Sequence, residues 1–225
     1  MNLKILSLVI IGVCILLPDV CYAFLSKDVH LLNMQNGLAD NTVSAVYKDK
    51  EGFVWFGTRN GLSRYDGRRI TNFERSRSYP SISNLKEVFD GVLAFVDNGV
   101  FSAFDLKKER FLSVVSSSGQ GIPSRGMLQR NDSLVWVISG SELHLMKRCA
   151  SKEGELRLRV QEKYTGWNNQ DNLLVAITYS SDKKSICLID EKGRIILLDA
   201  TNLNSFRVID LGRIGSLSVN SVLYD

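Results

Sequence analysis

The residues that could carry chemistry in this 225-residue sequence do not form a catalytic or metal-binding set by type and spacing. The two histidines, His30 and His144, are far apart, and no Cys, His, Asp and Glu residues have the spacing of metal ligands. Most Asp residues fall at expected turns, where carboxylates cap backbone N–H groups. A carboxylate pair for glycoside cleavage needs two such groups roughly 5–10 Å apart, which sequence does not place. We therefore expect no catalytic residue, no metal and no cofactor.

Two groups of residues are candidates for ligand binding. Trp167 lies in a polar, turn-like segment, where an exposed indole could stack on a sugar; alternatively, the ring packs over the end of a sheet. Four arginines, which flank expected turns and strand ends, are Arg59, Arg64, Arg68 and Arg69. If they cluster on one face, they could hold an acidic glycan through bidentate ion pairs; the alternative is a solvated surface.

Short strands must position these residues. Residues 42–48, 53–57, 62–65 and 69–73 are rich in β-branched and apolar side chains and are separated by turn signals. The continuous apolar run at 53–57 predicts a strand that is buried on both faces. Asn60-Gly61 predicts a type I′ hairpin turn, in which both central residues have positive φ. Four antiparallel strands in about 40 residues match one blade of a β-propeller.

Weaker copies of this pattern recur along the chain, and they predict blades near 38–80, 81–121, 122–170 and 171–215. The segment 217–222 then repeats the pattern of 38–43, so a truncated fifth blade is expected from 216. The spacing gives about 45 residues per blade, which is a propeller period. We expect an incomplete ring and therefore the N-terminal piece of a longer protein. Trp55 and Trp136, which lie in the middle of apolar strands, are expected in the core between blades.

The opening stretch closely resembles the two-component regulator propeller repeat. The motif residues that carry the resemblance are Asn41, Asp49, Gly52, Trp55, Gly57, Thr58, Asn60, Gly61, Leu62, Tyr65, Asp66 and Gly67. The resemblance implies an all-β propeller of four-stranded antiparallel blades. It also implies the periplasmic sensor part of a hybrid two-component histidine kinase and response regulator that controls polysaccharide use. The family is anchored in the inner membrane, and the implied ligand is an oligosaccharide.

Two other functional classes stay open beside the sensor. One is a stand-alone exported propeller that binds a protein or a carbohydrate, and the other is a propeller lyase or hydrolase. Open blade edges could support self-association, and the full-length family could form homodimers. The net charge of +4 without a Lys/Arg run gives no indication of nucleic-acid binding.

The N-terminus and the cysteines bear on localisation. Residues 1–23 combine a single lysine, an apolar run and a small residue at the expected cleavage position, which predicts a secretory signal peptide; an uncleaved anchor is the alternative. No second apolar span follows, so we expect an exported, periplasmic chain without a membrane span after signal removal. Cys149 and Cys187 remain in that chain, either as a disulfide or, as their contexts favour, as two unpaired thiols.

Overall fold

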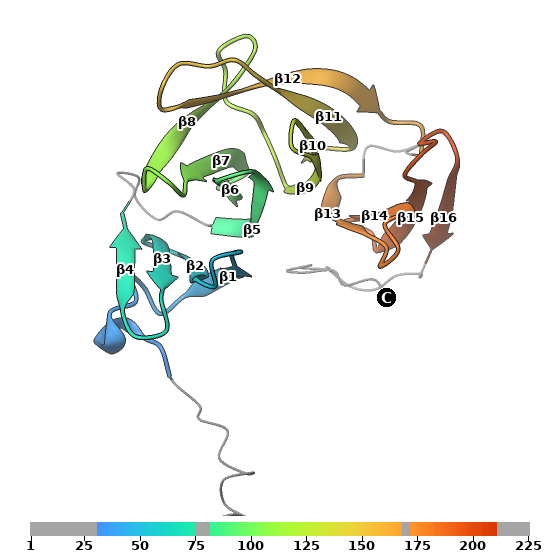
Figure 1. The fold of residues 1–225 in the computed structure, drawn as a ribbon. Coiled ribbons are helices and arrows are strands. Elements are labelled where there is room, and N and C mark those ends of the chain that lie inside the picture. Colours follow the sequence, from blue (N-terminus) through green and yellow to red (C-terminus); the bar gives the residue numbers. More distant parts are fainter. Residues whose placement is uncertain (1–30, 75–81, 168–171, 211–225) are drawn as a thin grey trace, which may run out of the picture. The chain divides into compact units, whose positions relative to one another are not determined.

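The computed structural model describes residues 31–74, 82–167 and 172–210 (Figure 1). Asn33–Asp225 forms one compact unit, separate from Met1–Leu32, and the description below concerns the former. The predicted signal peptide and the predicted start of a fifth blade lie outside the described residues. The elements are η1 (Met34–Asn36), β1 (Val43–Lys48), β2 (Val54–Thr58), β3 (Gly61–Tyr65), β4 (Ile70–Phe73), β5 (Ile82–Phe89), β6 (Val92–Asp97), β7 (Val100–Asp105), β8 (Arg110–Ser116), β9 (Gly126–Asn131), β10 (Leu134–Ser139), β11 (Glu142–Cys149), β12 (Glu155–Tyr164), β13 (Leu174–Tyr179), β14 (Ser185–Asp190), β15 (Arg194–Asp199) and β16 (Phe206–Asp210).

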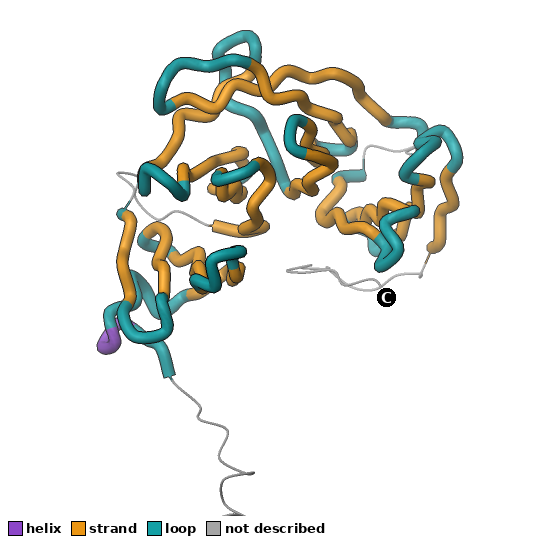
Figure 2. The backbone as a smooth tube through the Cα atoms, in the orientation of Figure 1, coloured by secondary structure: helices purple, strands orange, loops and turns teal. Residues whose placement is uncertain are grey.

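The strands pair in chain order into antiparallel groups of four, and strands make up most of the described chain (Figure 2). We call these groups blade 1 (β1–β4), blade 2 (β5–β8), blade 3 (β9–β12) and blade 4 (β13–β16). The first strands of consecutive blades contact one another, β1 with β5, β5 with β9 and β9 with β13. This arrangement confirms the predicted all-β fold of four-stranded propeller blades. None of the described residues forms a helix long and apolar enough to span a membrane.

Blades 2 and 3 share hydrogen bonds through their outermost strands, which the repeat pattern did not predict. β12 is ten residues long, and its first part, Glu155–Leu158, pairs in parallel with Ser113–Ser116 of β8. The result is one eight-stranded sheet. Leu156 and Leu158 are fully buried in the core that these two blades share, so apolar burial accompanies the extra pairing.

The β2–β3 hairpin forms at the expected place, but its turn differs from the prediction. Thr58 pairs with Gly61, so the loop consists of Arg59 and Asn60. Only Gly61 has a positive φ (+109°), and Asn60 does not. The Thr58 side chain fixes this shifted turn, because its Oγ1 accepts from Asn60 N (3.1 Å) and donates to Gly61 O (3.0 Å). The type I′ prediction is therefore wrong in blade 1, whereas Asn98 and Gly99 in blade 2 both have positive φ.

The core lies between blades, where the two predicted tryptophans are. Trp55 is 1% exposed; it stacks with Phe73 of its own blade and contacts Phe104 of blade 2 at a tilt of 59°. Trp136, also 1% exposed, joins a cluster that includes β13, β14 and β15 of blade 4. Gly57 lets blade 1 approach blade 2 closely, since a Cβ there would come within 2.5 Å of Ile82 Cγ2. The expectation that 53–57 is buried on both faces is only partly met, because Val54 and Phe56 are half-buried.

Both cysteines of the described chain are free. Cys187 is buried in β14, and burial raises the pKa of its thiol. Cys149 ends β11, where its Sγ lies 3.7 Å from Lys147 O. The disulfide alternative is therefore not what the structure contains.

Candidate functional site

Trp167 does not offer the stacking surface that its polar segment suggested. The side chain is 6% exposed and belongs to the apolar cluster between blades 3 and 4. Its ring meets Phe206 of β16 edge to face, at 6.5 Å between centroids. An aromatic ring that is packed on its neighbours has no free face for a sugar. Trp167 is thus a core residue at the end of a blade, as the alternative interpretation held.

The four arginines do not form one cluster. Arg59 lies in the β2–β3 loop, and Arg68 and Arg69 lie in the β3–β4 loop, at opposite ends of β3. All three are exposed, and the backbone N–H groups of Arg68 and Arg69 are bound by Asp66 Oδ1 at 2.7 and 2.6 Å. A five-residue strand separates the two ends by about 15 Å, which is too far for one carboxylate to bridge. Of the four, Arg64 lines a groove.

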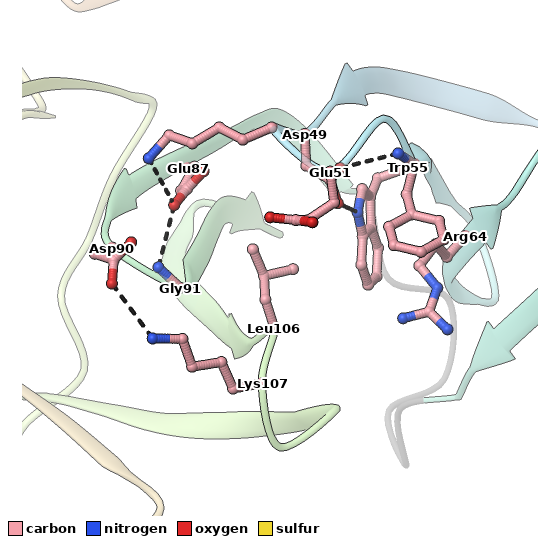
Figure 3. A pocket seen from close by; sticks show the side chains of 11 residues that line it. Asp49, Glu51, Trp55, Arg64, Glu87, Asp90, Gly91, Leu106 and Lys107 are labelled. Atoms are coloured by element: carbon pink, nitrogen blue, oxygen red, sulfur yellow. Dashed lines mark hydrogen bonds and ion pairs between the residues drawn. The ribbon is translucent and has the colours of Figure 1, made fainter.

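This groove, hereafter the first groove, lies between blades 1 and 2 and has a volume of about 260 Å³ (Figure 3). Blade 1 supplies the β1–β2 turn, Trp55 and Arg64, and blade 2 supplies the end of β5 and the β5–β6 and β7–β8 turns. These segments meet because β1–β2 and β3–β4 turns lie at the same end of an antiparallel blade. The lining residues are Asp49, Lys50, Glu51, Phe53, Trp55, Arg64, Glu87, Asp90, Gly91, Leu106 and Lys107.

Asp49 organises the blade 1 side of the first groove. Its Oδ1 accepts from Phe53 N (2.9 Å), and its Oδ2 accepts from Trp55 Nε1 (2.7 Å). The carboxylate is nearly buried at 9% exposure, so these bonds replace the water that it lost. The Asp and Trp of the repeat motif therefore serve one purpose: the acid closes the β1–β2 turn and fixes the indole beneath the groove.

Arg64 closes one side of the first groove. Its guanidinium lies 4.7 Å from the centroid of the Phe53 ring and pairs with Glu109 of blade 2 at 2.6 Å. The guanidinium is also 5.6 Å from the ring centroid of Trp55. The side chain is only 19% exposed, so stacking and ion pairing hold it in one position. Arg64 thus joins the two blades and presents a fixed cation to the groove.

The other cations of the first groove are also paired. Lys50 Nζ lies 3.3 Å from Glu87 Oε1, and this hydrogen bond raises the pKa of Lys50. Lys107 Nζ lies 3.4 Å from Asp90 Oδ2 (Figure 3). Glu51 is exposed and has no ion-pair partner within the described part of the chain, so it is the lining carboxylate most available to a ligand.

Chemically, the first groove is suited to binding polar neutral molecules. Phe53 and Leu106 give it an apolar surface, while ammonium, guanidinium and carboxylate groups supply both donors and acceptors. Across residues 31–74, 82–167 and 172–210, no group of three or more His, Cys, Asp or Glu side chains is arranged to hold a metal ion. A sugar, which has apolar C–H faces and hydroxyl rims, fits this combination of surfaces.

Several lining residues were missed by sequence reasoning. Glu87, Asp90, Leu106 and Lys107 belong to blade 2, whose repeat is weak, and nothing in blade 1 alone indicates that they face Asp49. The signal that could have found them is the repeat register itself. Once β5–β8 is aligned on β1–β4, its turn residues fall at the blade end that carries the motif.

The comparisons with known proteins agree with this repeat. Residues 37–60 match the family model described as two component regulator propeller, a range that begins just after η1 and ends in the β2–β3 loop. No curated protein is significantly similar to the chain. The chain therefore carries a regulator propeller repeat in blade 1.

Solved structures share the fold at low sequence identity. The extracellular domain of a B. thetaiotaomicron protein assigned as a hybrid two-component system superposes with a TM-score of 0.61 and 18% identity over 81% of this chain. A second extracellular domain from that organism, assigned as a one-component system, gives 0.60 and 14% identity over 83% of this chain. The chain covers only 24% and 28% of those two structures. The β-propeller domain of Swd1 from Myceliophthora thermophila gives 0.51 and 16% identity, with 77% of this chain and 56% of that one covered.

Proposed function

We propose that this chain is the extracytoplasmic, ligand-sensing propeller of a two-component regulator, and that its ligand is an oligosaccharide. The observation that carries the proposal is the regulator propeller repeat at 37–60, whose motif residues build a groove between blades. The extracellular location of the two B. thetaiotaomicron domains supports export. A propeller by itself does not decide function, since the fold also occurs in Swd1.

The first groove supports a saccharide as the ligand. Its volume of about 260 Å³ is at the lower limit of the roughly 300–1,000 Å³ typical of small-molecule pockets. It therefore suits one end of an oligosaccharide. Phe53 and Leu106 can contact the C–H face of a sugar, and Glu51 and Lys107 can bind its hydroxyls. In this role the chain binds and positions, and signal output comes from kinase and regulator domains elsewhere in the polypeptide.

Binding is tested by titrating the purified chain with a panel of neutral oligosaccharides in a calorimeter. Glu51→Ala removes an exposed lining carboxylate without breaking a described hydrogen bond, and we expect it to weaken binding about 5- to 20-fold. The matched control is Glu191→Ala, which removes an exposed carboxylate from the β14–β15 turn, at the opposite end of a blade. Equal effects of the two variants would place the ligand outside the first groove.

The signalling role is tested by reading the coding sequence that follows the Asp225 codon. The coding sequence downstream of the Asp225 codon should continue into further propeller blades, a membrane helix and a histidine kinase. A stand-alone propeller gene, with a stop codon and no kinase in the same polypeptide, would contradict the sensor function and favour the exported binding protein. Glycan cleavage detected in the same panel would instead favour a lyase or hydrolase.

A further inference from the structure

A second groove lies between blades 3 and 4, at the position that corresponds to the first groove. Blade 3 supplies the end of β9, and blade 4 supplies the end of β13 and its β13–β14 and β15–β16 turns. The blade 4 segments are the counterparts of the blade 2 segments that line the first groove. The second groove has a volume of about 510 Å³, and its lining residues are Gln129, Arg130, Asn131, Tyr179, Lys183, Ala200 and Thr201.

The second groove is positively charged, and its cations are not neutralised. Arg130 and Lys183 line it, and no carboxylate does. Neither cation forms an ion pair with another described residue. Free arginine and lysine side chains that face one groove, with no acid among its lining residues, favour an anionic ligand.

The carboxylates in the adjacent turns of blade 4 accept hydrogen bonds from backbone and side-chain groups of their own turns. Asp182 Oδ1 accepts from Ser180 Oγ (2.6 Å) and from Lys184 N (3.0 Å). Asp199 Oδ1 accepts from Thr201 N at 2.7 Å. These bonds lower the pKa of both acids and turn them toward the loops that they close. In blade 3, Asp132 lies exposed in the β9–β10 turn and does not line the groove.

A β-bulge directs Arg130 to the second groove. Leu134 pairs with Asn131 and Val135 pairs with Gln129, so Arg130 is the extra residue on β9. Bulges re-aim side chains and are frequent beside functional sites. The guanidinium lies 5.1 Å from the ring centroid of Trp136, which fixes the cation on a buried indole.

Lys183, the second cation of this groove, lies in a turn with unusual backbone geometry. Lys183 has a φ of +56°, which is unusual for a residue with a long side chain and is more readily adopted by Gly or Asn. Its N–H donates to Ser180 O at 2.9 Å, which closes the β13–β14 turn. Position 183 therefore places a long, charged side chain where the backbone favours Gly or Asn.

Neutral hydrogen-bonding groups complete the second groove. Burial raises the pKa of the Tyr179 hydroxyl and the nearby Arg130 charge only partly opposes that rise, so the phenol remains a neutral donor at physiological pH. Gln129 is exposed and makes no described side-chain hydrogen bond. The groove thus offers a guanidinium fork, an ammonium group, a phenol and an amide to one ligand.

We propose that the second groove binds the carboxylate or sulfate group of an acidic saccharide. Arg130 would hold two anion oxygens through its fork, Lys183 would supply a point charge, and Tyr179 and Gln129 would bind neighbouring hydroxyls. The inference rests on the proposed saccharide-sensing function, and it names a charged ligand class and a place on the propeller for it.

The experiment compares three probes on the purified chain by calorimetry: a uronic-acid disaccharide, a sulfated disaccharide and the uncharged disaccharide of the same linkage. We expect at least one acidic probe to bind about 10-fold or more tightly than the neutral one, with affinity that falls as salt is raised. The uronate and sulfate arms identify which anion the groove takes. The test variant is R130Q/K183N, in which asparagine suits the positive φ of position 183.

We expect R130Q/K183N to lower the affinity for the acidic probe at least 10-fold and to leave the midpoint of thermal unfolding nearly unchanged. Arg125→Gln is the matched control, because Arg125 is exposed and lies just before the other end of β9. Equal binding of acidic and neutral probes, or no effect of R130Q/K183N, would overturn the inference. Neutral oligosaccharides that still bind in that case would leave the proposed function standing. If only uronate and sulfate monosaccharides bound, through Arg130 and Lys183, and no oligosaccharide bound more tightly, the groove would be confirmed and the proposed function would fail.

Discussion

The two grooves lie at corresponding ends of two blade pairs, blades 1 and 2 and blades 3 and 4, yet the charges on their walls differ. In the first groove, four carboxylates and three cations line the walls, and every cation has a carboxylate partner. In the second, two cations line the walls without a carboxylate. The backbone repeat is therefore conserved between the pairs while the charge is not. The propeller repeat therefore sets where each groove lies, and the turn residues set the charge of its walls.

One position accounts for much of the difference. Asp49 directly follows β1 in blade 1, where its N–H donates to Phe53 O. The corresponding residue in blade 3 is Asn131, which pairs with Leu134. Asn131 Oδ1 still accepts the turn N–H of Ser133 at 3.0 Å, so the turn is kept while the charge is lost. The indole N–H of Trp136, unlike that of Trp55, then has no well-aligned acceptor among the described residues. The Arg130 guanidinium lies over that indole, 5.1 Å from its ring centroid.

The largest expected effect is on stability, from truncating the indoles beneath the grooves. Trp55→Ala and Trp136→Ala should each lower the free energy of unfolding by about 3–5 kcal/mol, because each removes a fully buried side chain from an interblade core. Urea unfolding followed by circular dichroism measures this. A small loss in either variant, below about 1 kcal/mol, would contradict the interblade packing described here.

The phenylalanine variants sharpen the comparison of the same two positions. Trp55→Phe leaves Asp49 Oδ2 without its donor, whereas Trp136→Phe removes an indole that has no well-aligned acceptor. Trp55→Phe should therefore cost about 1–2 kcal/mol more than Trp136→Phe. Equal costs would mean that the Asp49 bond contributes nothing beyond packing.

Asp49 itself should matter more than its counterpart in blade 3. Asp49→Ala leaves Phe53 N and Trp55 Nε1 without their acceptor in a buried site, and we expect a loss of about 1–3 kcal/mol. Asn131→Ala removes the two bonds that its Oδ1 accepts from Ser133 N and Ser133 Oγ in an exposed turn, and it should cost less than about 1 kcal/mol. Thermal unfolding of the two variants gives the ranking. A double-mutant cycle with Trp55→Phe should show coupling only for Asp49.

The sequence was sufficient for the fold and for the roles of most motif residues, because these depend on local chemistry. Asp66 accepts a backbone N–H of its own β3–β4 turn, and Gly57 allows blade 1 to approach Ile82 of blade 2. Both roles follow from residue type and position within the blade. The β8–β12 pairing was not predictable, since it depends on how far β12 extends beyond its own blade. The grooves were not predictable for a related reason: Lys107 and Asp49 meet only through the packing of two blades. The sequence left both interpretations of Trp167 open, because the polar residues around it do not reveal that its ring packs on Phe206.

A single charge should move the second groove toward the character of the first. Asn131→Asp restores a carboxylate at the turn while keeping the acceptor for Ser133 N. We expect it to lower the affinity for the acidic disaccharide about 3- to 10-fold, since the new charge repels the ligand and pairs with Arg130. Calorimetry at low salt measures the change, and raising the salt should shrink it. Asp132→Asn, which alters the exposed neighbour outside the groove, is the control and should change affinity less than twofold.

The smallest expected effect belongs to an exposed ion pair of the first groove. Lys107 and Asp90 are each 76% exposed, so their attraction is screened by water and opposed by the side-chain entropy lost on pairing. Lys107→Ala should therefore change the free energy of unfolding by less than about 0.5 kcal/mol. It should also leave the acidic disaccharide unbound by the first groove, because Asp49, Glu51 and Glu87 keep that site negative. The matched binding assay uses Lys107→Ala in the R130Q/K183N background, where the second groove should no longer bind the acidic probe. Acidic-probe binding that survives in that background and is lost with Lys107 would show that pairing does not neutralise a groove cation, and the contrast between the two grooves would then fail.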